Sequence, residues 1–263
     1  MARSGYYAYM NRLPSNRKLE NKILETYIKN IFEEHQARYG SDRIQKVLKK
    51  MGITINRKRI KRLMNQLDLF AKGSRKSYKN YTKRVNPSRP NLINQVFSTT
   101  GRNKVWVGDI TYIPTKEGTL YLSTYIDIFS RKVVGFKTGP RMKESLVIES
   151  FEEAINKERP TKGLIIHTDQ GSQYTGAAFQ NYLRDRGFKT SNNRKGNPYD
   201  NALMESFYKT LKRELVNDMK FISRAQAQLE IFKYIETYYN TKRIHSSLEY
   251  MSPVEYERLH TQN

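Results

Sequence analysis

The stretch Val105-Trp106-Val107-Gly108-Asp109-Ile110-Thr111-Tyr112-Ile113 decides the fold class of this chain. Its aromatic and β-branched residues predict a strand, and Asp109 interrupts a run that is otherwise largely apolar. An acid at this point would face the core or a cleft, because charges are rarely buried without a partner. The stretch therefore marks both the first strand of a sheet and a candidate site.

The residues that follow alternate between strand and helix patterns. Gly118 marks a turn, and we expect further strands over residues 120–128, 132–138, 164–167 and 188–191. We expect helices over about 142–157, 175–186, 201–216 and 223–240, with a polar loop at 192–199. Hairpin-linked strands followed by alternating helices and strands indicate an α/β domain with a mixed sheet.

Two further acids lie where chemistry is expected. Asp169 comes directly after the short apolar strand 164–167, and the ends of such strands are the usual ligand sites of α/β sheets. Glu205 lies one turn into an amphipathic helix. Taken singly, each acid is better explained as a helix cap or an ion-pair partner. Taken together with Asp109, they form a set of hard oxygen ligands suited to Mg²⁺ or Mn²⁺.

Composition narrows the choice of substrate. The 263 residues include 48 Lys and Arg against 25 Asp and Glu, a formal charge of +23. This excess points to a polyanion. No run of eighteen apolar residues and no signal peptide is found, so we expect a cytoplasmic protein that binds nucleic acid rather than a membrane. Cys is absent, which excludes disulfides, thiolate zinc sites and cysteine nucleophiles.

The charge is concentrated before the first strand, where residues 1–100 carry 23 Lys and Arg against 6 Asp and Glu. We expect a helix over 19–38 that ends at Gly40, a second helix capped by Ser41, and a third capped by Asn56. Two short helices joined by a glycine turn, the second of them basic, suggest a helix-turn-helix. The alternative is a small helical bundle with a solvated basic face.

The basic face of the third helix is the candidate DNA contact. Most of its side chains would bind phosphate and position the protein without reading sequence; they are Arg57, Lys58, Arg59, Lys61 and Arg62. The segment that follows is polar, basic and broken by proline, so it is expected to be a linker. The predicted domains are a stub at 1–18, the helical domain at 19–71, the basic linker at 72–98 and the α/β domain at 99–263.

Three motifs then identify a family. They are Trp106 to Ile113, His167-Thr168-Asp169-Gln170-Gly171-Ser172-Gln173-Tyr174, and Gly196-Asn197-Pro198-Tyr199-Asp200-Asn201-Ala202-Leu203-Met204-Glu205-Ser206-Phe207-Tyr208. In order and spacing they resemble the integrase-type core of bacterial insertion-sequence transposases, closest to the second-frame transposase of the insertion sequence three family. The 35 residues between Asp169 and Glu205 match the interval of the Asp-Asp-Glu transposases and retroviral integrases. The helix-turn-helix and the closing segment 245–253 are also similar to that family.

The resemblance implies an RNase H-like core with a mixed five-stranded sheet, preceded by the all-α helix-turn-helix domain. It implies that Asp109, Asp169 and Glu205 are catalytic and hold two Mg²⁺ ions, for which Mn²⁺ would substitute. The reaction would be strand cleavage at the element's ends, followed by attack of the released 3′-hydroxyl on another phosphodiester. The alternatives are a metal-dependent nuclease or resolvase on the same fold and a non-catalytic DNA-binding regulator.

Four residues near the acids are candidate DNA contacts: Asn201, Lys209, Lys212 and His167. Asn201, Lys209 and Lys212 fall on the helix face of Glu205, and the family usually has a basic residue seven positions after its Glu, which Lys212 supplies. Lys209 could instead pair with Glu205. His167 could bind phosphate or be a strand histidine satisfied by hydrogen bonds. Asp127, in the segment 126–131 that is also typical of the family, is expected to cap a turn or to pair with Arg131. Asp200 is expected to cap the helix that bears Glu205.

The resemblance also implies partners. Double-stranded DNA, both element ends and target, is the expected substrate, and a homo-oligomer is expected on it. In this family the element's first frame supplies a further helix-turn-helix and a leucine zipper, which makes the first-frame protein a candidate partner. A nucleoid-associated protein of the bacterial cytoplasm is expected.

Overall fold

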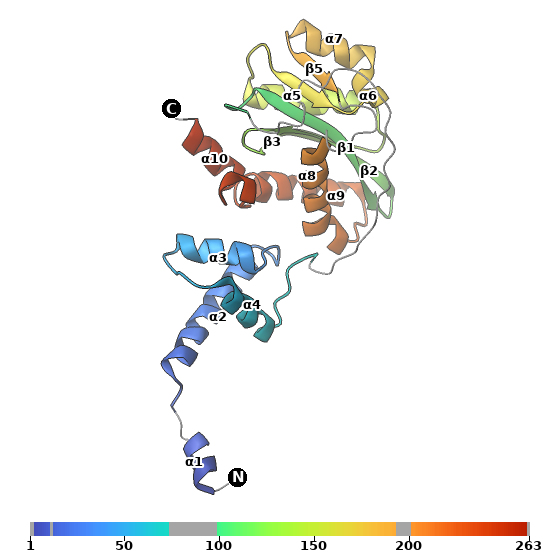
Figure 1. Ribbon diagram of the computed structural model, residues 1–263. Helices are drawn as coiled ribbons and strands as arrows, with labels where there is room; N and C mark the ends of the chain where they lie inside the picture. The colour runs from blue at the N-terminus through green and yellow to red at the C-terminus, as the bar shows by residue number, and fades with distance from the viewer. Residues whose placement is uncertain (1–2, 11–12, 74–98, 193–200, 262–263) are drawn as a thin grey trace, which may run out of the picture. The chain divides into compact units, whose positions relative to one another are not determined.

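The computed structural model describes residues 3–10, 13–73, 99–192 and 201–261, and the chain divides into two compact units, Met1–Ser77 and Tyr78–Asn263 (Figure 1). Most of the predicted linker, from residue 74 to 98, lies outside the described residues. None of the described helices is both long and apolar enough to cross a bilayer.

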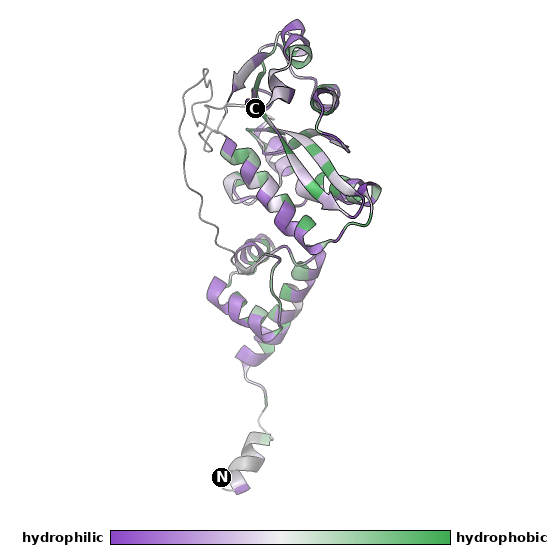
Figure 2. Cartoon of the chain, turned by 90° about the vertical axis from the view of Figure 1, so that its right-hand side faces the viewer, coloured by the Kyte–Doolittle hydropathy of each residue, from purple (hydrophilic) through white to green (hydrophobic). Residues whose placement is uncertain are grey.

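The first unit is helical, with α1 (Arg3–Met10), α2 (Asn16–Glu34), α3 (Ser41–Lys50) and α4 (Arg57–Gln66). Figure 2 shows its helices largely hydrophilic, with hydrophobic residues where α2, α3 and α4 face one another. The residues buried there confirm the predicted apolar stripes and include Ile28, Ile44, Leu48, Ile60 and Leu63. Three short helices can bury only one small core, so their other faces are left to carry charge.

The helix ends show one correct and one incorrect prediction. The side chain of Asn56 accepts a hydrogen bond of 2.8 Å from Lys58 N and caps α4, as predicted. Gly40 does not end α2, which stops at Glu34; Gly40 is instead the N-cap of α3, and Ser41 is the first residue of that helix. The error arose because Gln36 and Ala37 reverse the chain with positive φ angles, a conformation usually reserved for glycine.

The second unit contains a five-stranded mixed sheet in the order β3-β2-β1-β4-β5. The strands are β1 (Val105–Thr115), β2 (Gly118–Asp127), β3 (Val133–Gly139), β4 (Ile165–Thr168) and β5 (Lys189–Asn192). The first three are antiparallel neighbours, whereas β4 lies parallel to β1, and β5 parallel to β4. All five predicted strands are therefore confirmed, each within a few residues of its expected bounds.

Helices cover both faces of this sheet. In Figure 1, α5 (Glu144–Glu158) lies behind it, and α8 (Ala202–Glu214) and α9 (Arg224–Phe232) lie in front. Trp106, Tyr125 and Phe151 are fully buried where α5 meets the sheet. Gly108 lies in the same layer, and a Cβ there would stand 2.5 Å from the ring of Tyr125, so the residue before Asp109 must be glycine.

The helix expected over about 175–186 is confirmed as α7 (Ala177–Asp185). A short helix that was not predicted, α6 (Ser172–Thr175), precedes it, and the chain breaks between the two at Gly176. The carboxylate of Glu144 accepts a hydrogen bond of 2.9 Å from Phe179 N, at the start of α7, and a Cβ on Gly176 would collide with that carboxylate. The break is thus fixed by a side chain from α5, which periodicity within the segment cannot reveal.

The C-terminal part is tied to the core by a buried ion pair. The helix expected over 223–240 continues beyond α9 as the wider π-type turns of η3 (Lys233–Tyr239); η2 (Val216–Asp218), η4 (Ser246–Leu248) and α10 (Pro253–His260) complete the fold. Arg243 donates hydrogen bonds of 2.9 Å to both carboxylate oxygens of Glu214, the last residue of α8, and both side chains are buried. The segment after η3 therefore anchors the C-terminal end of the helix that bears Glu205.

Candidate functional site

Asp109 lies at the point where β1 leaves its neighbour β4. The two strands pair only from Val105 to Val107 on β1, so beyond that point β1 has β2 on one side and, among the described residues, no strand on the other. Helix α8 packs against this part of β1: the hydroxyl of Tyr208 donates a hydrogen bond of 2.5 Å to the carbonyl oxygen of Asp109. The predicted catalytic strand and catalytic helix are therefore in direct contact.

Both carboxylate oxygens of Asp109 accept hydrogen bonds. Oδ1 accepts one of 2.7 Å from Ile110 N, and Oδ2 accepts one of 2.8 Å from Nδ2 of Asn201, at the N-terminus of α8. Burial nevertheless raises the pKa of Asp109 from 3.8 to about 6, and the charges of Asp169 and Glu205 act in the same direction. The three acids are therefore close enough to interact electrostatically.

Asp169 follows the last residue of β4, as predicted. Its Oδ1 accepts a hydrogen bond of 2.9 Å from Gly171 N, and its carbonyl oxygen accepts one of 3.1 Å from Asn192 in β5. The carboxylate is thus held in a turn at the C-terminal end of β4. Asp169 therefore lies close to the region where β4 pairs with β1.

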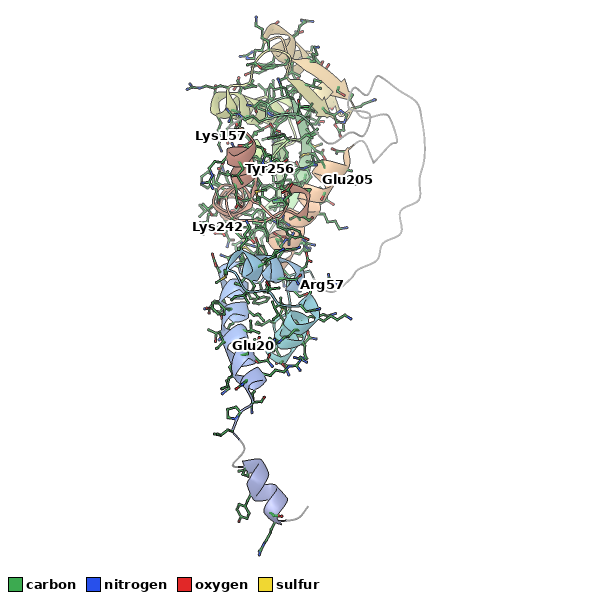
Figure 3. All side chains as sticks on the ribbon, turned by 60° about the vertical axis from the view of Figure 1, so that its left-hand side comes forward. Glu20, Arg57, Lys157, Glu205, Lys242 and Tyr256 are labelled. Carbon is green, nitrogen blue, oxygen red and sulfur yellow. The ribbon has the colours of Figure 1, made fainter. Side chains whose placement is uncertain are left out.

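Glu205 lies in the first turn of α8 and is exposed (Figure 3), while its neighbours Met204 and Phe207 are buried in the core. Among the residues that the structure describes, no three carboxylate or imidazole side chains stand together closely enough to hold a metal ion. A metal bound by all three acids therefore requires a further approach of their side chains. The segment 193–200, which leads into α8 and contains Asp200, lies outside the described residues.

The lysines of α8 differ in their surroundings. Lys209 is exposed, and no ion pair joins it to Glu205 among the described residues. Lys212 is half-buried, and its Nζ lies 4.3 Å from the ring centre of Tyr112 in β1. Burial lowers the pKa of Lys212, whereas the charge of Asp109 acts to raise it. Lys212 is thus held against Tyr112 and within the influence of the Asp109 charge.

Two site residues have unexpected surroundings. His167 is buried, and its Nδ1 lies 2.8 Å from the hydroxyl of Ser191 in β5, which favours the structural interpretation over phosphate binding. Asn201, predicted to bind DNA, contacts Asp109 instead. Sequence reasoning also missed Tyr208, although the helical spacing of seven residues from Asn201 places both on the α8 face toward Asp109.

Asp127 is a turn cap, as predicted. Its carboxylate accepts hydrogen bonds of 2.6 Å from Asn103 N and 2.7 Å from Phe129 N. Burial raises its pKa from 3.8 to about 6. The residue holds the connection between β2 and β3, where Arg131 has a positive φ, and plays no part in the acid set.

The first unit carries the second candidate interface. Most of the predicted α4 contacts are exposed; they are Arg57, Lys58, Lys61 and Arg62. Arg59 differs, because its guanidinium forms two hydrogen bonds of 2.9 Å with Glu20 and also binds Asn21, both in α2. A surface hollow lined by Gly40, Arg57 and Lys61 opens at the N-terminus of α3.

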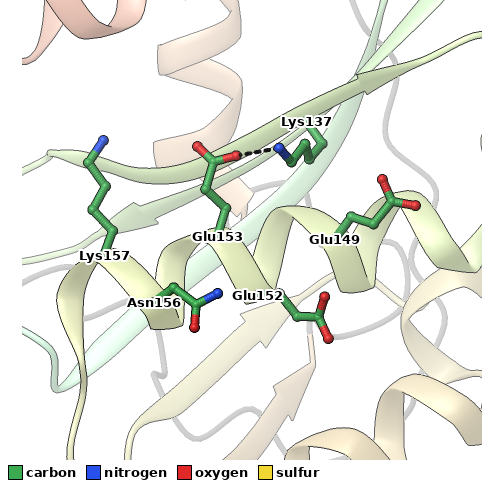
Figure 4. Close-up of a pocket in the computed structure, with 6 residues that line it drawn as sticks. All are labelled: Lys137, Glu149, Glu152, Glu153, Asn156 and Lys157. Carbon is green, nitrogen blue, oxygen red and sulfur yellow. Dashed lines mark ion pairs between the residues drawn. The ribbon is translucent and has the colours of Figure 1, made fainter.

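A hollow on α5 has the opposite character (Figure 4). It is lined by Glu149, Glu152 and Glu153 together with Asn156, Lys137 and Lys157, and Lys137 pairs with Glu153 at 3.0 Å. Three carboxylates on one face repel DNA phosphate. This hollow therefore offers DNA phosphate a less favourable charge than the basic face of α4 does.

Comparisons with known proteins agree with this geometry. An integrase core domain matches residues 99–198, a second integrase core model matches 186–253, and an HTH-like domain matches 18–77. The chain is 58% identical to the transposase for insertion sequence element IS904 of Lactococcus lactis subsp. lactis (strain IL1403), covering 95% of this chain and 99% of that protein. It is 36% identical to the transposase InsF for insertion sequence IS3A of Escherichia coli (strain K12), covering 98% and 90%.

A solved structure supports the fold. The chain superimposes on a chain of the simian T-cell lymphotropic virus intasome, determined in complex with the PP2A regulatory subunit B56 gamma, with a TM-score of 0.51 and 20% identity. The match covers 83% of this chain and 71% of the viral one. The RNase H-like arrangement predicted for the sheet is therefore confirmed.

Proposed function

The chain belongs to the transposases of bacterial insertion sequences, in which an HTH-like domain precedes an integrase core, and we propose that Asp109, Asp169 and Glu205 are its catalytic carboxylates. A transposase acts on DNA, so the substrate class is fixed by the family. The assignment of residues is supported above all by one observation: hydrogen bonds from Asn201 and Tyr208 hold the helix of Glu205 against Asp109, at the edge where β1 leaves β4.

The donor set fits magnesium. All three side chains offer hard oxygen ligands, which Mg²⁺ prefers and for which Mn²⁺ is a usual substitute. Asp109 has an unfavourable environment as an isolated anion, since burial and two neighbouring carboxylates all raise its pKa. A bound divalent cation would instead favour the ionised form of Asp109. Two Mg²⁺ ions held by these acids would stabilise the attacking and leaving oxygens of an in-line displacement.

The residues around the acids have distinct proposed roles. Asn201 orients the carboxylate of Asp109 through its hydrogen bond, and Tyr208 fixes α8 on β1. Lys212 binds a DNA phosphate close to the reacting one, since its ammonium lies within the influence of Asp109. Lys209 is exposed on the same helix and offers a more distant phosphate contact.

The two units have different proposed roles. The exposed basic face of α4, with the hollow beside Arg57 and Lys61, binds backbone phosphate and contributes affinity. Arg59 has its guanidinium occupied by Glu20 and Asn21 and mainly joins α4 to α2. On DNA we expect a homo-oligomer that pairs the two element ends, with the first-frame protein of the same element as a further partner.

The reaction proceeds in two proposed steps. Water attacks the phosphodiester at the element's end, and the P–O bond to the 3′ oxygen breaks to release a 3′-hydroxyl. That hydroxyl then attacks a second phosphodiester, so that one P–O bond forms as another breaks and no covalent bond to the protein is made. Pre-cut labelled end DNA with Mg²⁺ tests this sequence.

Joined products from pre-cut ends, absent when EDTA replaces Mg²⁺, support the proposal. Cleavage of intact ends without joining would instead favour a nuclease that only hydrolyses. DNA left unchanged by a protein that binds it would favour a non-catalytic regulator. The assay should include the first-frame protein as a separate addition, because end recognition is expected to depend on it.

A further inference from the structure

Tyr112 is an exposed aromatic residue on a strand whose neighbouring positions are buried. Its side chain is 63% exposed, whereas Thr111 and Ile113 on either side are buried. The sheet does not require a large ring at this position, because the core beneath β1 is filled by residues such as Trp106 and Ile113. Exposure of a single ring is common on protein surfaces, so the case for a ligand contact depends on what lies beside Tyr112.

The position of Tyr112 relative to the acids is fixed by α8. Tyr208 holds the helix on the backbone of Asp109, and one turn later Lys212 places its Nζ 4.3 Å from the centre of the Tyr112 ring. Tyr112 is also three residues beyond Asp109 on the part of β1 that, within the described residues, has no strand partner on its β4 side. The ring and the ammonium thus form one surface, and the ammonium is the part of it that feels the charge of Asp109.

We propose that Tyr112 and Lys212 form a subsite for one nucleotide flanking the reacting phosphate, in which the Tyr112 ring stacks on the base and Lys212 binds the phosphate. The inference rests on the proposed function for the location of the reacting phosphate. Aromatic rings bind bases in this way without regard to sequence, because every base has a π face. The ligand is therefore a nucleotide whose base face is exposed, as it is at a cut or frayed DNA end.

A purely structural role for Tyr112 makes a different prediction. A ring that serves only to hold Lys212 by a cation–π contact affects every DNA substrate equally when it is removed. A ring that stacks on a base affects only substrates that have a base at one position. The presence or absence of that single base therefore separates the two roles.

The experiment measures joining of pre-cut ends in which a single abasic nucleotide is moved through the terminal positions. With the natural protein, joining is expected to fall on the order of tenfold at one position. Tyr112→Phe retains the ring and should show the same dependence. Tyr112→Ala should join intact DNA more slowly by a similar factor. Its joining rate should not fall further when the base at that position is missing. Phe232→Ala removes an exposed aromatic of α9 and serves as the matched control.

A binding measurement gives a readout without turnover. End DNA carrying 2-aminopurine at the sensitive position, or at each terminal position in turn, is mixed with protein in Ca²⁺. We expect quenching by the natural protein and by Tyr112→Phe but not by Tyr112→Ala. If the natural protein, supplied with the first-frame protein, neither cleaves nor joins DNA, the proposed function fails, and the quenching still decides the stacking subsite.

Two results would overturn the subsite. One is equal quenching by the natural protein and by Tyr112→Ala. The other is that Tyr112→Ala lowers the joining rate by the same factor on intact DNA and on DNA that lacks a base, wherever the abasic nucleotide is placed. A circular dichroism melt of each variant accompanies the assays, so that a misfolded protein is recognised before its activity is interpreted.

Discussion

The amide of Asn201 donates a 2.8 Å hydrogen bond to Oδ2 of Asp109, linking the residue just before α8 to the middle of β1. This hydrogen bond crosses from one predicted catalytic element to the other. It indicates that Asn201 positions Asp109 rather than binding DNA directly.

Removing this hydrogen bond tests that role. Asn201→Ala should reduce joining while leaving affinity for end DNA nearly unchanged, because the deleted amide orients a carboxylate and carries no charge. Asn201→Gln, with a longer side chain, should restore part of the activity. Measured affinities that fall in parallel with the joining rates would show that Asn201 is a DNA contact after all.

The basic face of α4 is expected to control salt dependence. Reversal of charge in Arg57→Glu, Lys61→Glu and Arg62→Glu together should flatten the plot of log affinity against log salt by roughly 0.9 for each phosphate that is no longer neutralised. Arg59→Gln should leave the slope nearly unaltered, because its guanidinium already binds Glu20 and Asn21.

Lys29→Glu on α2 is the control for charge alone, because it reverses one exposed charge outside the predicted face. Titrations of fluorescent end DNA at several salt concentrations give the slopes. A triple variant with the slope of the natural protein would mean that α4 is only solvated.

The buried pair of Glu214 and Arg243 should dominate the stability of the C-terminal part. Arg243→Met leaves the buried Glu214 carboxylate with only the more exposed Arg213, 3.2 Å away, as a cation, which is expected to cost about 3–5 kcal/mol of unfolding free energy. The double variant Glu214→Leu with Arg243→Met removes both charges and should be less destabilised than the single one. Urea denaturation of the three proteins measures this. Equal stability of Arg243→Met and the natural protein would show that the pair contributes nothing.

The raised pKa of Asp127 predicts that the free energy of unfolding depends on pH. Burial raises its pKa from 3.8 to about 6 in the folded protein. Below about pH 4 the group is protonated in both states. As the pH rises from 4 to 6 the unfolded chain ionises first, so unfolding becomes easier, and above 6 the effect levels off.

The contribution of Asp127 is isolated by comparison with Asp127→Asn, whose side chain has no proton to lose. Between pH 4 and 7 the natural protein should lose about 3 kcal/mol of unfolding free energy relative to that variant. Asp109 titrates in the same direction in both proteins, so its effect cancels in the difference. A constant difference across this range would contradict the assignment.

Local pattern was sufficient to predict most of the fold. The aromatic and β-branched residues of 105–113 and the caps such as Asn56 act within a few residues, so they are visible in the sequence. The break at Gly176 was not, because it depends on Glu144 from another helix. The reversal at Gln36 and Ala37 was missed because these residues adopt positive φ angles without being glycine.

The candidate site was predictable to a similar extent. The identities of Asp109, Asp169 and Glu205 followed from motifs and spacing. The contacts of Asn201 with Asp109 and of Lys212 with Tyr112 did not, because they depend on how α8 packs against β1. His167 was ambiguous for the same reason, and its burial against Ser191 becomes evident only once β5 is paired with β4.

The central claim is that three carboxylates perform the chemistry, and the most direct measurement compares four variants in one assay of cleavage and joining with Mg²⁺. Asp109→Asn, Asp169→Asn and Glu205→Gln should each abolish both products while retaining affinity for DNA, because binding rests on basic residues. Glu149→Gln, which neutralises an exposed carboxylate of α5 outside the acid set, is the control and should keep most activity. Near-normal cleavage or joining by any one of the three acid variants would contradict the claim.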